Sequence, residues 1–177
     1  MNMSRGFENL VVALDEHRRG HHYGKYRGIV TDPDDPEKMG RIKAQVPSIY
    51  GDEQDSPWCL PVSPFAGDSH GLLLLPKKGD GVWIEFEAGN IAHPLWTGCW
   101  WAKGELPDPQ GVNQHVLTSP KGLQIILDDD APKLQLLHPG GAEITLEESR
   151  ITIKIGSAQI ELSSSGVSVN NGALEVQ

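Results

Sequence analysis

The sequence has few of the features that mark a protein with disulfide bonds, a structural zinc site or a membrane-spanning helix. Its 177 residues include two cysteines, Cys59 and Cys99, and neither belongs to a CxxC or Cys/His pattern of zinc ligands. Because free cysteine is among the most often buried residue types, we expect both thiols to be buried. No apolar run approaches the roughly 20 residues that a membrane-spanning helix needs. We also expect no secretory signal, since no apolar core with a cleavage site follows the N-terminus.

Basic residues are also scarce. Lys and Arg total 15 against 24 Asp and Glu, which gives a formal net charge of −9 and a sequence pI of about 5.1. A general nucleic-acid binder needs a basic surface for the phosphates. This balance therefore argues against nucleic acid as a partner, and it fits poorly with docking on an anionic membrane.

Glycine and proline are frequent, with 20 and 13 copies, and this disfavours an all-α fold. One helix is indicated, over residues 4–19. Its apolar residues have the i, i+3, i+4, i+7 spacing of a single helix face: Phe7, Leu10, Val11 and Leu14. Such a stripe has to be covered, either by the body of this chain or by another protein.

Residues 26–101 show the pattern of short strands separated by turns. Gly40–Val46 alternates, with Ile42, Ala44 and Val46 predicted to face one way. Val82–Glu87 alternates in the same manner. The expected strands are Tyr26–Thr31, Gly40–Val46, Trp58–Val62, Leu72–Leu75, Val82–Glu87 and Ile91–Trp101. This number of short strands favours a small closed barrel of the OB type, because closure removes exposed sheet edges.

Residues 114–177 form a quasi-repeat of about seven short strands with brief turns between them. Apolar residues recur at every second position, and one chain would form a ribbon too thin to bury them. We therefore predict that three chains wind into a prism roughly 30–35 Å long, each giving one strand per turn. In this arrangement the backbone of each strand would pair with strands of the other chains. The residues expected at the trimer axis are Ile144, Leu146, Ile151, Ile153, Ile155, Ile160, Leu162, Val167 and Val169.

Three sequence blocks resemble the OB domain of contractile-tail baseplate spikes: GRIKAQVP (residues 40–47), LLLPKKGDGVWIEFE (73–87) and HPLWTGCWW (93–101). That group includes phage baseplate assembly protein V, the T4-type central spike and the VgrG proteins of type VI secretion. The resemblance is strong over residues 26–101 and weaker from residue 114 onward. It implies a mainly β homotrimer with an N-terminal helix, an OB-fold Greek-key barrel and an intertwined triple-stranded β-prism (β-helix).

The resemblance also implies a domain plan and partners. The expected parts are a helical segment (1–24) that docks on the tail hub, an OB domain (25–101), a linker (102–113) and the prism (114–177). Phe7, Leu10, Val11 and Leu14 would contact the hub protein or the OB ring. Leu174 and Val176 would carry a separate PAAR-type tip protein, and the bacterial envelope would be the target. The protein would be made in the bacterial cytoplasm and would reside in the virion tail baseplate or a related injection particle.

Two features of some relatives are missing from this sequence. The linker is too short for the lysozyme domain that some spikes carry, and no HxH pair is present to bind iron at the apex. We therefore expect a structural protein without catalytic residues, metal or cofactor. The small size and the lack of a fused hub domain favour a phage-type baseplate over a type VI spike.

Three other groups of residues could form sites or have ordinary structural roles. His17 and His21, at i, i+4 spacing with His22 adjacent, could supply half a zinc site or simply end the helix with cations. The run Asp128–Asp130 could bind a hard cation or lie in a solvated turn. Ser63, Asp68 and His70 could form a nucleophilic triad, but no GxSxG context supports one.

The tryptophans near the end of the OB segment leave a second function open. Trp96, Trp100 and Trp101 could stack single-stranded nucleic acid or sugar, as OB folds often do, or pack in the barrel. Residues 81–101 contain no Lys or Arg, which favours packing. The alternative function is an OB-type binding module for single-stranded nucleic acid or glycan, with the repeat as a tail.

Overall fold

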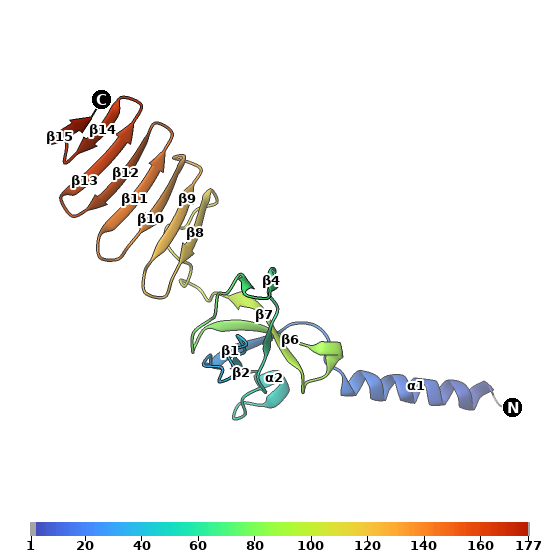
Figure 1. Ribbon diagram of the computed structural model, residues 1–177. Helices are drawn as coiled ribbons and strands as arrows, with labels where there is room; N and C mark the ends of the chain where they lie inside the picture. The colour runs from blue at the N-terminus through green and yellow to red at the C-terminus, as the bar shows by residue number, and fades with distance from the viewer. Residues whose placement is uncertain (1–2, 177) are drawn as a thin grey trace. The chain divides into compact units, whose positions relative to one another are not determined.

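The computed structural model describes residues 3–176, with side chains described for residues 6–174. The chain divides into two compact units, Met1–Ala102 and Lys103–Gln177 (Figure 1). The fold is mainly β with one long N-terminal helix, as predicted. No described helix is long and apolar enough to cross a membrane.

Helix α1 (Met3–Gly20) opens the first unit, and His17, Arg18 and Arg19 lie in its last turn. Cations at this end interact favourably with the negative end of the helix dipole. The helix predicted over residues 4–19 is thus confirmed.

The OB unit contains a curled five-stranded sheet in the order β2-β1-β6-β7-β3, together with a small β4–β5 hairpin. Its elements are β1 (Tyr26–Asp32), β2 (Lys43–Gln45), α2 (Pro47–Tyr50), β3 (Leu60–Pro61), β4 (Ala66–Gly67), β5 (His70–Gly71), β6 (Gly81–Phe86), a 3-10 turn η1 (Glu87–Gly89) and β7 (Pro94–Trp100). Irregular pairing between Val30 and Asp32, and between Trp83 and Ile84, bends the sheet as bulges do.

The core of this unit follows the predicted alternation. Ile42, Ala44 and Val46 are fully buried around β2, and Val82, Ile84 and Phe86 are buried on β6. Period-two side-chain alternation places these residues on one face of the curled sheet. The remaining buried apolar residues of this core are Val30 and Cys59.

The structure differs from the sequence prediction at three places in the OB unit. Leu72–Leu75 is not a strand but an irregular, exposed segment, because four consecutive leucines have no alternation and find no ladder partner. Pro47 begins the short helix α2, which was not predicted. Cys59 is buried, and burial raises the pKa of its thiol to about 11, but Cys99 is exposed and the prediction for it was wrong.

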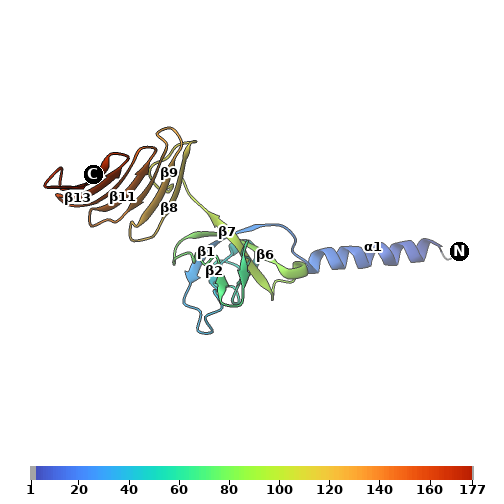
Figure 2. The ribbon, with the colours of Figure 1, turned by 45° about the horizontal axis from the view of Figure 1, so that its top comes forward.

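The second unit is one eight-stranded antiparallel sheet in which every strand pairs with its neighbours along the chain (Figures 1 and 2). Its strands are β8 (Gln114–Thr118), β9 (Gln124–Asp128), β10 (Lys133–Leu137), β11 (Ala142–Glu147), β12 (Arg150–Ile155), β13 (Ala158–Ser163), β14 (Gly166–Val169) and β15 (Leu174–Val176). Strand β8 adds one strand to the seven that the pattern predicted.

Strand pairing in this sheet differs from the prediction of one strand per turn from each chain. All the ladders join sequence neighbours of the same chain. The physical reason is the length of the connections, because turns of a few residues return the chain directly as a hairpin.

Candidate functional site

The sheet of the second unit has one apolar face, which the strand register defines. Residues directly opposite each other in an antiparallel ladder point to the same side. One row across the sheet consists of His115, Leu127, Leu134, Leu146, Ile151, Leu162, Val167 and Val176. The second row consists of Leu117, Ile125, Leu136, Ile144, Ile153, Ile160, Val169 and Leu174. These two rows are called the apolar face below.

The structure brings all nine predicted axis residues together on this side of the sheet. Eight lie in the two rows, and Ile155 continues the same side opposite Ala142 and Ala158. Along the sequence, the apolar residues change between odd and even numbers from one strand to the next. The hairpin turns offset this change, so the apolar residues of neighbouring strands lie on the same side of the sheet. Leu117, Ile125, Leu127, Leu134 and Leu136 extend the face beyond the residues that the sequence pattern predicted.

Among the described residues of the second unit, none covers this face. Ile151 is 38% exposed, Ile153 44% and Leu162 47%. Large contiguous apolar patches are rare on monomeric soluble proteins and mark interaction sites. The face therefore has the character of an interaction surface.

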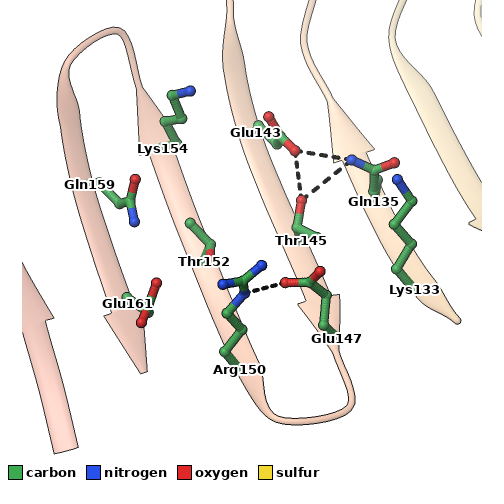
Figure 3. A pocket seen from close by; sticks show the side chains of 10 residues that line it. All are labelled: Lys133, Gln135, Glu143, Thr145, Glu147, Arg150, Thr152, Lys154, Gln159 and Glu161. Atoms are coloured by element: carbon green, nitrogen blue, oxygen red, sulfur yellow. Dashed lines mark hydrogen bonds and ion pairs between the residues drawn. The ribbon is translucent and has the colours of Figure 1, made fainter. Parts of the chain in front are cut away.

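The opposite side of the same sheet is polar over strands β10–β13 (Figure 3), whereas Val116 of β8 and the buried Ile126 of β9 lie on that side farther along the sheet. A shallow hollow of about 370 Å³ is lined there by Lys133, Gln135, Glu143, Thr145, Glu147, Arg150, Thr152, Lys154, Gln159 and Glu161. Glu143 accepts hydrogen bonds from the Thr145 hydroxyl at 2.7 Å and from the Gln135 amide at 3.0 Å. These donors, the Thr145 hydroxyl first, lower the pKa of Glu143, and the bond from Arg150 lowers the pKa of Glu147. Polar side chains over these four strands suit contact with water.

Helix α1 carries the second exposed apolar surface. Phe7 is 69% exposed, and Leu10, Val11 and Leu14 are also exposed. At the other end of the chain, Leu174 is exposed on β15, an edge strand that pairs only with β14 among the described strands. Val176 lies opposite Val167 in that ladder, and its side chain lies outside the described residues.

Comparison with known proteins identifies this architecture. A family profile for the type VI secretion system and phage-baseplate injector OB domain matches residues 26–101. A second profile, for the phage baseplate V C-terminal trimerisation domain, matches residues 114–175. The chain belongs to the baseplate and type VI injector spike family.

One curated relative has a similar sequence over part of this spike-family chain. The type VI secretion system spike protein VgrG4b of Pseudomonas aeruginosa is 30% identical over 114 residues, which is 55% of this chain and 14% of that protein. The match thus spans a small part of the relative's length. All residues of the apolar face except Val176 lie within the segment that matches the trimerisation profile.

The histidine pair and the aspartate run of this spike-family chain have partners within the chain. The rings of His17 and His21 stack at 3.9 Å, and His21 Nδ1 lies 2.8 Å from the His17 carbonyl oxygen. Asp128 accepts hydrogen bonds from the backbone N–H groups of Ala131 and Asp130, and these bonds lower its pKa. The described part of one chain contains no group of three or more His, Cys, Asp or Glu suited to a metal.

The possible triad of Ser63, Asp68 and His70 is not assembled. The Ser63 hydroxyl donates to the Phe65 carbonyl at 2.9 Å, while His70 Nδ1 lies 2.9 Å from the backbone oxygen of Asp68. The Asp68 carboxylate instead accepts a hydrogen bond from the Ser69 hydroxyl. These contacts build a turn, and none of them activates a nucleophile.

Of the three tryptophans near the end of the OB segment, Trp96 and Trp100 have hydrogen-bond partners. Trp96 Nε1 donates to the Gly40 carbonyl at 3.1 Å, and Trp100 Nε1 donates to the Val82 carbonyl at 3.2 Å. The Arg27 guanidinium lies 5.0 Å from the Trp100 ring centroid and 5.5 Å from that of Trp83. Cation–π contact therefore occupies part of the ring faces. Trp101, in contrast, is 62% exposed.

The sequence pattern did not reveal one structural site, the clamp in the loop after β1. The Asp35 carboxylate is buried, bonds the Arg41 guanidinium at 2.7 Å and accepts backbone N–H bonds from Glu37, Met39 and Arg41. The Arg41 side chain and these N–H groups hold the pKa of Asp35 well below its usual range. The segment around it, TDPDDPE (31–37), contains three aspartates, and the sequence does not show which of them turns inward.

Proposed function

We propose that the protein is the homotrimeric central spike of a phage-type contractile injection apparatus, a structural part with no bond chemistry of its own. The continuous apolar face on an otherwise polar sheet carries the proposal. Three copies of that face, turned toward a common axis, would bury one another and leave three polar faces outside. The phage assignment is supported by the phage baseplate V description of the matching trimerisation profile.

The dimensions suit such a prism. A five-residue strand spans about 17 Å, and an equilateral prism with sides of that length has faces about 5 Å from its axis. Side chains of Ile, Leu and Val fill a space of this depth. Full burial of one such side chain contributes about 1.5–3 kcal/mol, so the half-exposed residues would gain about 1 kcal/mol each. Repeated along both rows in three chains, this gain exceeds the usual stability of a single domain.

The strand direction suits a part that transmits force. Adjacent strands lie about 4.8 Å apart, so the eight-stranded sheet is about 34 Å long from β8 to β15. Its backbone hydrogen bonds point along that length. A load applied from β15 toward β8 would press the ladders together, while the apolar axis keeps the three sheets from splaying.

The two ends of the chain supply the docking surfaces of the proposal. The exposed stripe Phe7, Leu10, Val11 and Leu14 on α1 would dock on the baseplate hub protein. Leu174 and Val176, repeated three times around the last strand, would seat a PAAR-type tip protein that meets the bacterial envelope. The protein would then reside in the tail baseplate of the particle after synthesis in the bacterial cytoplasm.

Solution mass measured by light scattering tests the proposal. We expect about 58 kDa, three times the 19.3 kDa of one chain, and a band of that size on an SDS gel run without boiling. A folded 19.3 kDa monomer would refute the trimer and favour an OB module that binds nucleic acid or glycan. Salt-dependent binding to a labelled single-stranded oligonucleotide would then distinguish those ligands.

A further inference from the structure

We propose that the three copies of His115 form a binding site for one divalent transition-metal ion on the threefold axis, at the β8 end of the prism. The inference rests on the proposed trimer, since each chain contributes one ligand. His115 is the one side chain in the two rows of the apolar face that can ligate a metal.

The register places this histidine close to the axis. His115 and Leu117 flank the middle residue of β8, and His115 lies directly opposite Leu127 in the row that continues to Val176. The midline of each face is the part of a triangular prism closest to its axis. The prism faces would lie about 5 Å from that axis, so the three imidazoles would extend inward from them and converge at one level. A histidine nitrogen binds zinc at about 2.0–2.1 Å, a distance that such convergence allows.

Asp129 supplies the supporting contact. Its Oδ2 lies 3.5 Å from His115 Nε2, which leaves Nδ1 of the ring for a metal. The backbone N–H of Asp129 donates to the Asn113 carbonyl at 2.9 Å, and this bond holds the backbone of Asp129 beside the start of β8. A metal-ligating histidine commonly contacts a carboxylate through its other nitrogen, which orients the ring and raises its basicity.

The position favours a particular coordination. Three neutral imidazoles plus one water form the open tetrahedral set that zinc adopts in many proteins. Strand β8 is the edge strand of the sheet, so no further strand of this sheet lies beyond the three histidines, while Leu127 and its copies would close the other side. The ion would tie the three chains together at the end where the apolar contacts stop.

Zinc titration of the full-length trimer tests the site, with stoichiometry from calorimetry and metal analysis after dialysis. We expect one Zn²⁺ per three chains, lost in His115→Gln and kept in the control His17→Gln/His21→Gln, which removes the stacked pair on α1. Asp129→Asn should weaken binding by roughly 10- to 100-fold without removing it. Should His115→Gln fail to assemble, His115→Leu continues the apolar row and serves the same comparison.

The outcomes separate the two proposals. A trimer of about 58 kDa that binds no zinc, or a His115→Gln trimer that still binds one ion, would overturn the metal site and leave the spike function standing. A wild-type monomer would refute the trimer, and the site with it. Cobalt in place of zinc should give the visible absorption of a tetrahedral centre in the wild-type trimer and none in His115→Gln.

Discussion

Replacement of Ile153 by aspartate tests the apolar face most directly. Ile153 lies between Ile144 and Ile160 in the second row and is 44% exposed in the single chain. A carboxylate there costs the isolated sheet little, because water still reaches it. In the trimer three carboxylates would meet at one level around the axis.

The expected penalty is large compared with the gain from the isoleucine. Burial of a carboxyl group in apolar surroundings raises its pKa by up to about 3–5 units. Each unit is worth about 1.4 kcal/mol, so three groups that must all be protonated at neutral pH would cost on the order of 10–20 kcal/mol per trimer. We therefore expect Ile153→Asp to be a folded species of 19.3 kDa by light scattering near neutral pH, and to regain trimer mass as the pH falls and the carboxyls are neutralised.

The matched control is Thr152→Asp, which adds the same charge one residue away. Thr152 lines the hollow on the polar side, where Lys154 and Arg150 also lie. This variant should remain a trimer of about 58 kDa at every pH at which the wild type does. A stable Ile153→Asp trimer at neutral pH, or a monomeric Thr152→Asp chain, would refute the assignment of the faces.

Three further predictions concern the first unit. Ile84→Ala leaves a cavity at a fully buried core position and should lower the free energy of unfolding, measured by urea denaturation, by about 2–5 kcal/mol. Ile29→Ala, at a 38% exposed position, should lower it much less. Equal losses would contradict the core assignment. The lowered pKa of Asp35 means that its ionised form stabilises the fold, so the urea midpoint should fall as the pH drops below about 4. Asp35→Asn should be less stable than the wild type at neutral pH, and its urea midpoint should fall less in acid. A pH dependence unchanged in Asp35→Asn would contradict the clamp. Leu10→Glu on α1 should leave the trimer mass unchanged but abolish co-purification with the hub protein, and a retained complex would exclude the stripe as the docking surface.

The parts of the fold that the sequence revealed are those where burial imposes a simple period. Ile42, Ala44 and Val46 alternate because one side of a short strand faces the core, and each is fully buried. The helix of residues 4–19 was visible because its apolar spacing is helical. In contrast, Leu72–Leu75 has no alternation, and its irregular conformation depends on the absence of a ladder partner, which only the tertiary structure reveals.

The candidate site was predictable in composition but not in extent. Apolar residues at every second position predicted one apolar face. Which residues of neighbouring strands lie opposite each other depends on the geometry of the turns, and the spacing of the apolar residues does not specify that geometry. The run QHVLT in β8 also alternates, but its histidine breaks the apolar pattern, so neither the strand nor His115 was recognised. The Asp35 clamp was hidden because several nearby aspartates look equivalent in sequence and only one turns inward.

In the second unit, strands pair within one chain, so the contacts that hold the sheet together differ from those that would join the chains. In an interwoven prism, the same strand pairs would do both. The backbone hydrogen bonds, which would bear a load along the proposed rod, lie inside single chains, whereas assembly of the proposed trimer would depend on the apolar face. Each sheet is a meander of sequence-local ladders, so its hairpins can form before the chains meet. The apolar face is then exposed until association, which favours aggregation of unassembled chains. The opposite face carries the Glu147–Arg150 ion pair and the Glu143–Thr145 hydrogen bond. Its polarity would limit apolar contact to one side of the sheet and thereby direct association toward the proposed closed trimer.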